Sequence, residues 1–179
     1  ETLGNIFAPT SRQASCQYGI GVDGRVGMYV EEKDRSWCTS SAANDNRAVT
    51  IEVASDTTDP YAVTSAAYAG LLNLVTDICK RNGKNKVVWF GDKAKTLAYT
   101  PKSNEMVLTV HRWFANKSCP GNYLYNLHPQ IVAEVNRRLA GGSVDTGTAV
   151  SYQVKVTADA GLNCRTAPIN GTVIMAYEK

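Results

Sequence analysis

The sequence predicts an α/β fold, in which a central mixed β-sheet is flanked by helices and followed by a short β-rich C-terminal appendage. Strand-like runs occupy 15–22, 25–30, 48–54 and 86–90, and polar and apolar residues alternate in the run at 48–54. Runs with apolar residues at helical spacing lie between or after them, at 59–82 and 129–139. Strands and helices that alternate along a chain in this way pack in layers around one core.

The N-terminal strands are the clearest elements. Residues 1–7 place their apolar side chains on one side and predict the end of a helix that begins upstream. Asp23-Gly24 separates two strand-like runs and therefore predicts a β-hairpin. In the strand at 48–54, Val49, Ile51 and Val53 alternate with polar residues, so we expect Glu52 on the face opposite these core contacts.

The first long helix is predicted to open at Asp59-Pro60, as N-cap and first-turn proline, and to end at Asn82-Gly83. The polar stretch 91–105 reads as a loop, and 106–110 as a short apolar strand.

The last helix is expected from about Pro129 to Leu139, where Gly141-Gly142 stops it. His128 is then interpreted as a residue at the start of this helix, beside the proline.

Composition limits the class of protein. The length of 179 residues fits one domain at 1–140, a small-residue linker at 141–150 and a short segment at 151–179. The net charge of the chain is +3. No dense basic run predicts a nucleic-acid partner, and no apolar stretch predicts a membrane span. Five scattered cysteines argue against a disulfide framework and favour synthesis in a reducing compartment.

His111 and Cys119 form the most informative pair. They lie eight positions apart, and a Pro-Gly turn follows the cysteine. Imidazole and thiolate are the preferred protein ligands of zinc, so the pair predicts part of a metal site. Two alternatives stay open: a hydrogen-bonded core histidine beside an inert thiol, or a nucleophilic Cys119 with His111 as its base.

Three further residues are candidates for the chemistry beside such a metal. Glu52 is a lone carboxylate on an apolar strand and would act as a general base for water, unless it simply faces solvent. Lys117 could stabilise a tetrahedral oxyanion, and the Tyr18 hydroxyl could do the same, although a solvated lysine and a core tyrosine are the ordinary alternatives.

Several motifs occur in a fixed order along the first 140 residues. They are Gln17-Tyr18-Gly19-Ile20-Gly21, Asp23-Gly24-Arg25-Val26, residues 31–37, the segment from Asn46 to Val53, His111-Arg112, and residues 117–121. In this combination the chain resembles the zinc-dependent N-acetylmuramoyl-L-alanine amidases of type 2. That fold is shared with phage lysozyme-like amidases and peptidoglycan-recognition proteins.

The resemblance implies a hydrolase that cleaves the amide between N-acetylmuramic acid and the L-alanine of the stem peptide, with zinc as cofactor and bacterial peptidoglycan as partner. It implies these roles: His111 and Cys119 as zinc ligands, Glu52 assisting the water, Tyr18 and Lys117 supporting the tetrahedral intermediate, and Trp37 and Asn46 lining the substrate groove.

One ligand of the family pattern is missing. The family holds zinc with two histidines and a third ligand, and the first histidine lies on a strand before the N-terminal helix. His128 matches no ligand position, so we expect an upstream segment to carry this histidine. Cys38, after Trp37, stands where many relatives have histidine, and we interpret it as a buried thiol.

The C-terminal segment resembles the opening of a bacterial Src-homology-3-like wall-binding domain, through Leu162-Asn163-Cys164-Arg165 and Pro168. Only about the first half of such a domain is present. This implies a modular endolysin or autolysin, made in the bacterial cytoplasm and acting on the cell wall. The remaining alternatives are a non-catalytic peptidoglycan-binding module and a cysteine peptidase that uses Cys119.

Overall fold

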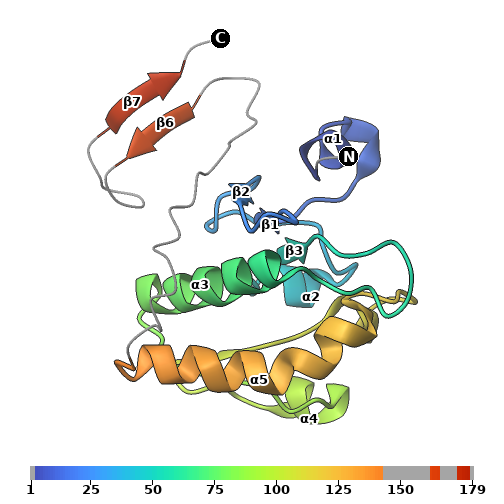
Figure 1. Ribbon diagram of the computed structural model, residues 1–179, viewed down its shortest axis with the longest axis vertical. Helices are drawn as coiled ribbons and strands as arrows, with labels where there is room; N and C mark the ends of the chain where they lie inside the picture. The colour runs from blue at the N-terminus through green and yellow to red at the C-terminus, as the bar shows by residue number, and fades with distance from the viewer. Residues whose placement is uncertain (1–2, 143–161, 166–172, 178–179) are drawn as a thin grey trace.

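The computed structural model describes residues 3–142, 162–165 and 173–177, and it confirms the predicted α/β class (Figure 1). One sheet has the strand order β2-β1-β3 and is mixed, because β1 pairs antiparallel with β2 and parallel with β3. A second, parallel pair joins β4 to β5. The strands are β1 (Tyr18–Ile20), β2 (Val26–Met28), β3 (Ile51–Val53), β4 (Lys86–Val88) and β5 (Glu105–Val107).

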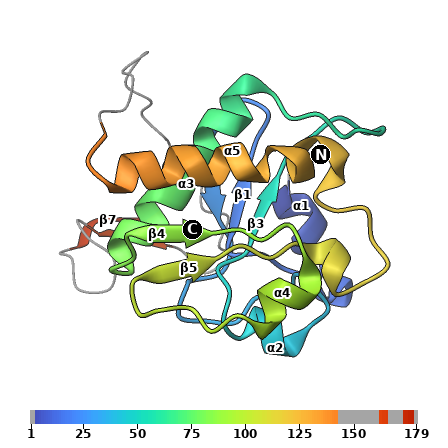
Figure 2. The same ribbon diagram turned by 90° about the horizontal axis from the view of Figure 1, so that it is seen from below.

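The helices surround these strands. They are α1 (Leu3–Phe7), α2 (Ala42–Asp45), α3 (Ser65–Arg81), α4 (Lys93–Ala98) and α5 (Gly121–Leu139), with 3-10 turns η1 (Thr10–Arg12) and η2 (His111–Trp113). The long helices α3 and α5 lie side by side (Figures 1 and 2). Apolar side chains of both helices and of both sheets form one continuous core.

The predicted hairpin is confirmed, and its turn requires glycine. Gly24 has a φ of +79° between β1 and β2. A Cβ atom at Gly24 would lie 2.6 Å from the Ala66 carbonyl oxygen at the start of α3. Only glycine fits, because a side chain would meet both the strained backbone angle and this close contact.

Strand β1 lies between two helical layers. A Cβ atom at Gly19 would lie 2.4 Å from Leu3 Cδ1, so the Gly19 face of the sheet looks toward α1. Ile20 lies on the opposite face, against Gly70 of α3. Glu52 is paired with Gly19 in the parallel register and therefore lies on the α1 face. The prediction for its orientation, away from the main core, agrees with this register.

The predicted start of α3 is wrong. The helix begins at Ser65 rather than at Asp59-Pro60, and the Thr64 hydroxyl accepts a hydrogen bond from Ala67 N at 3.0 Å. Tyr61 has a φ of +60°, which is incompatible with a continuous helix from Pro60. The predicted end at Asn82-Gly83 is confirmed.

The predicted start of the last helix is also wrong, because α5 begins at Gly121 and passes through Pro129. His128 is therefore a buried residue of the helix interior rather than its first residue. Its Nδ1 lies 2.7 Å from the Leu124 carbonyl oxygen, and its ring stacks on Trp89 with centroids 4.3 Å apart. These contacts stabilise the turn in which Pro129 lacks a backbone donor.

Two other parts of the chain complete the description. The stretch expected as a loop at 91–105 contains α4, whose N-cap Asp92 accepts a hydrogen bond from Lys95 N at 2.7 Å. Strands β6 (Leu162–Arg165) and β7 (Val173–Tyr177) pair antiparallel. The predicted linker beyond residue 142 and the remainder of the C-terminal segment lie outside the described residues.

Candidate functional site

The structure places His111 and Cys119 on the two arms of one short loop. His111 opens the 3-10 turn η2, four residues after the end of β5 at Val107, and the preceding Val110 has an extended backbone. The backbone N–H of Arg112 donates to the Cys119 carbonyl oxygen at 3.1 Å. This bond closes the loop, so the two predicted ligands are neighbours in space although eight positions separate them.

The Arg112 side chain holds the second arm of this loop in place. Its Nε donates to the carbonyl oxygens of Ser118 and Cys119 at 3.2 and 3.3 Å, and its Nη2 also donates to Ser118. Its Nη1 donates to Asn122 Oδ1 at 3.1 Å. The guanidinium lies 4.8 Å from the centre of the Tyr125 ring. One cation thus connects the cysteine arm to the first turn of α5.

His111 carries a buried nitrogen without a partner. Among the described residues, His111 Nε2 is the buried side-chain nitrogen or oxygen atom that lacks a hydrogen bond. Burial lowers the pKa of His111, and the nearby Lys117 lowers it further, whereas Asp45 opposes the shift. The imidazole is therefore neutral at pH 7. An unpaired buried nitrogen costs on the order of 1–3 kcal/mol, and a ligand at this atom would remove that cost.

Cys119 experiences the charges of two of the three predicted catalytic residues, Glu52 and Lys117. Burial raises the pKa of its thiol and Glu52 raises it further, while Lys117 and Arg112 lower it. The loop therefore brings the thiol within electrostatic range of the Glu52 carboxylate and the Lys117 ammonium. No hydrogen bond joins Glu52 to His111 or Cys119 in the described part of the chain.

Glu52 lies close to two cysteines, Cys16 and Cys38. The Cys38 thiol donates to Glu52 Oε1 across 3.6 Å. Burial raises the pKa of Glu52, and the contact with Cys38 offsets part of this shift. Burial, followed by the charge of Glu52, raises the pKa of Cys16 to about 12. Burial raises the pKa of Cys38 as well, so both thiols are protonated at neutral pH.

The positions of these two cysteines beside Glu52 result from the pairing of two loops, which neither sequence segment indicates by itself. Ser15 N donates to the Trp37 carbonyl oxygen at 3.0 Å, and Trp37 N donates to Ser15 Oγ at 3.0 Å. Cys16 and Cys38 are the next residues on these paired segments. Sequence spacing alone could not reveal a contact between segments 22 positions apart.

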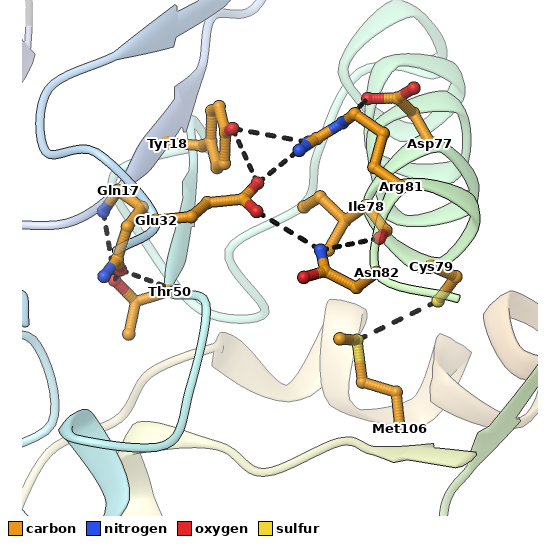
Figure 3. Close-up of polar contacts among 10 residues, drawn as sticks. All are labelled: Gln17, Tyr18, Glu32, Thr50, Asp77, Ile78, Cys79, Arg81, Asn82 and Met106. Carbon is orange, nitrogen blue, oxygen red and sulfur yellow. Dashed lines mark hydrogen bonds and ion pairs between the residues drawn. The ribbon is translucent and has the colours of Figure 1, made fainter. Parts of the chain in front are cut away.

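Tyr18 is not brought to this site. It is paired with Ile51, the neighbour of Glu52, so its side chain lies on the opposite face of the sheet. Its hydroxyl donates to Glu32 Oε1 at 2.7 Å and lies 3.4 Å from Arg81 Nη2 at the end of α3 (Figure 3). Burial and the bond to Glu32 raise the pKa of Tyr18 to about 12. Its hydroxyl is engaged in a polar network that joins the sheet to α3.

The two predicted groove residues differ in their surroundings. Trp37 exposes 55% of its surface, and the Arg35 guanidinium lies 5.3 Å from the centre of its ring. Asn46 is exposed and ends helix α2, where its backbone N–H donates to the Ala42 carbonyl oxygen at 3.0 Å. Only Trp37 is adjacent in the chain to a residue that contacts Glu52.

The metal-ligating side chains of the described residues provide only part of a zinc site. A neutral imidazole with an unpaired nitrogen and a nearby thiol are suitable ligands, which supports His111 and Cys119 as a pair. Within 3–142 and the two C-terminal strands, however, no group of three His, Cys, Asp or Glu side chains is arranged to hold a metal ion. A structural zinc site needs four ligands and a catalytic one needs three from protein, so this pair alone is insufficient.

The Glu52 carboxylate and the Lys117 ammonium both act electrostatically on Cys119, and Lys117 also acts on His111. The chain belongs to the N-acetylmuramoyl-L-alanine amidase family, whose model matches residues 3–122, about two thirds of the sequence. This family assignment associates the chain with amidase activity on peptidoglycan. No curated protein and no solved structure matches the chain. Over the described residues, no helix has the length and apolar character needed to cross a membrane.

Proposed function

We propose that this chain is the catalytic part of a zinc-dependent peptidoglycan hydrolase, which cleaves the amide between N-acetylmuramic acid and the L-alanine of the stem peptide. The observation that carries the proposal is the unpartnered, buried Nε2 of His111, on a loop that also presents Cys119 beside the charge of Glu52. Membership of the amidase family supports the choice of bond.

His111 and Cys119 would hold the zinc ion together with a further ligand outside the described residues. When bound, zinc supplies a polarised carbonyl and a water whose pKa is near 7. The neutral imidazole needs no deprotonation before it can bind a cation. The thiol must lose its proton, and the nearby Lys117 and Arg112 favour that loss.

Glu52 is proposed as the general base. Its pKa is raised by burial, so its affinity for a proton exceeds that of a solvent-exposed glutamate. It can take a proton from the attacking water and deliver it to the leaving amine. Lys117 is proposed to stabilise the negative charge on the tetrahedral intermediate, because its charge already acts on both His111 and Cys119.

The cysteine-peptidase alternative is disfavoured by the environment of Cys119. A nucleophilic thiol needs a lowered pKa, whereas burial and Glu52 raise this one. The role of the protein as an endolysin or autolysin, and the binding of its C-terminal segment to the wall, remain part of the proposal and depend on the resemblance of that segment.

The test is digestion of purified cell wall by the full protein that carries this chain, supplied with zinc. We expect new N-terminal L-alanine, and activity that disappears in a chelator and returns with zinc. His111→Ala should abolish the release and Glu52→Gln should slow it by about 10²–10⁴-fold, whereas the exposed Arg25→Gln should leave it unchanged. New reducing sugar ends without free L-alanine, or full activity in chelator, would overturn the proposal.

A further inference from the structure

The net positive charge of the chain is concentrated in one segment, residues 84–105. This segment has five lysines against Asp92 and Glu105, so its net charge is +3, which equals that of the whole chain. Basic and acidic residues therefore balance over the remainder of the sequence. The segment comprises β4, α4 and the start of β5, so the fold gathers this charge on adjacent elements (Figure 2).

Three of the five lysines are available to a partner. The other two are engaged, because Lys84 Nζ donates to the Ser103 carbonyl oxygen at 2.7 Å and Lys86 Nζ lies 3.1 Å from Glu105 Oε1. The available side chains are exposed, and within the described part of the chain their ammonium groups make no ion pair or hydrogen bond. They are those of Lys93, Lys95 and Lys102.

Helix α4 carries two of these lysines and presents apolar surface beside them. Thr96 is its one buried residue, so the rest of the helix faces solvent. Leu97 is 53% exposed, and Phe90, which precedes the helix, is 39% exposed. The Phe90 ring contacts that of Tyr99, which follows the helix, with centroids 5.0 Å apart. Both exposed apolar side chains therefore lie near Tyr99, on the surface that carries the free lysines.

This combination of side chains distinguishes between two kinds of anionic partner. A soluble polyanion would neutralise the lysines but would leave Leu97 and Phe90 in water. The boundary between the headgroups and the acyl chains of a bilayer accepts both, because apolar side chains enter the acyl region while ammonium groups stay with the phosphates. The surface therefore fits an anionic lipid layer better than a dissolved polymer.

From the charge, the exposure and the apolar side chains together, we infer that this surface docks on a bilayer that contains anionic lipids. We call it the α4 patch, and it consists of Phe90, Lys93, Lys95, Leu97 and Lys102. The docking is peripheral, since only side chains enter the lipid. It goes beyond the hydrolysis proposed above and requires neither zinc nor peptidoglycan.

Sedimentation with lipid vesicles tests the docking. The full protein is mixed, without zinc, with vesicles of phosphatidylglycerol and phosphatidylcholine, and separately with vesicles of phosphatidylcholine alone. We expect binding to the anionic vesicles only, and weaker binding as salt screens the exposed charges. Lys93→Gln combined with Lys95→Gln should weaken it about 25-fold, because each lysine near an anionic surface contributes a factor of about five. Leu97→Ser should weaken it about tenfold, because less apolar surface leaves water.

Matched controls separate the α4 patch from charge and apolar surface in general. Arg25→Gln combined with Lys33→Gln removes two positive charges from other side chains that are more than 60% exposed. Val22→Ser removes an apolar side chain that is 59% exposed on the β1–β2 hairpin. Both controls should bind the anionic vesicles as strongly as the unchanged protein.

Four results would overturn the inference. They are the absence of binding to anionic vesicles, equal binding to vesicles of phosphatidylcholine alone, equal weakening in the test and control variants, and equal binding to soluble poly(glycerol phosphate) that Leu97→Ser leaves unchanged. The last result would assign the lysines to an anionic wall polymer instead of a lipid surface.

Discussion

Replacing Glu32 by glutamine is expected to destabilise the protein by about 2 kcal/mol, because its carboxylate joins the loop before Trp37 to the end of α3. Oε1 accepts from the Tyr18 hydroxyl at 2.7 Å and from Arg81 Nη2 at 2.8 Å, and Oε2 accepts from Asn82 Nδ2 at 3.2 Å (Figure 3). The Glu32 and Arg81 side chains expose only 19% and 25% of their surface, so solvent weakens this pair less than an open surface pair.

The size of the expected destabilisation follows from the hydrogen bonds that glutamine retains at position 32. Its oxygen can still accept from Tyr18 and Arg81, but both bonds lose their ionic character, at a cost of roughly 0.5–1 kcal/mol each. Its NH₂ group replaces Oε2 and faces the donor of Asn82, which removes the third bond at roughly 1 kcal/mol. About 2 kcal/mol corresponds to a roughly 30-fold change in the folding equilibrium.

Urea unfolding of the two proteins measures this difference. Glu31→Gln is the matched control, because its ion pair with Lys33 leaves both side chains more than 60% exposed and should contribute almost nothing. If Glu32→Gln and Glu31→Gln have the same free energy of unfolding, or if Arg81→Met shows no coupling to Glu32 in a double-mutant cycle, the reasoning is refuted.

The same carboxylate predicts a pH dependence. Burial acts to raise the pKa of Glu32, but the hydrogen bonds from Arg81, Tyr18 and Asn82 outweigh it, and the pKa is lowered. The unfolded chain then binds a proton more readily than the folded one. The stabilisation is therefore complete above the unfolded pKa of about 4.3 and is lost as the pH falls through the folded pKa, where the difference between wild type and Glu32→Gln should vanish.

Three further predictions concern the site. Glu52→Gln should reduce the turnover number by about 10²–10⁴-fold yet stabilise the zinc-free protein at pH 7, because its raised pKa means that the buried charge opposes folding above the unfolded pKa; lower stability in urea would contradict this. Tyr18→Phe should cost about 1 kcal/mol of stability and leave amide hydrolysis unchanged, and a large drop in turnover at unchanged stability would restore Tyr18 to the catalytic set. Arg112→Ala should weaken zinc binding about tenfold in competition with a chromogenic chelator, with partial recovery in Arg112→Lys, since the bonds that hold the cysteine arm are lost; unchanged affinity would show that the loop needs no such support.

The N-terminal elements were predictable because their signals are local. Asp23-Gly24 prescribes a tight turn, and the alternation around Glu52 assigns its face without reference to any other element. The start of α5 was missed because Pro129 was interpreted as a first-turn residue. The buried positions Leu124, His128, Ile131 and Val135 repeat at helical spacing across that proline, so the signal was present and was given too little weight.

The local sequence pattern did not predict the position of Tyr18 or the positions of the two cysteines close to Glu52. Tyr18 directly precedes Gly19, which faces α1, so the alternation of the strand and the pairing of Tyr18 with Ile51 direct the tyrosine to the α3 face. Cys16 and Cys38 each resemble an ordinary buried thiol when taken alone. Their contact with Glu52 depends on the pairing of two loops, which has no period and no signature in either segment.

The sequence by itself determined the fold class, the hairpin, the face of Glu52 and the proximity of His111 to Cys119 across a short loop, because turn chemistry and periodicity act over a few residues. Only the tertiary structure decided which helix covers each face of β1, and therefore that Glu52 lies among two thiols while Tyr18 joins Glu32 and Arg81. The physical reason is that packing energy depends on which surfaces meet, and segments far apart in the chain supply those surfaces.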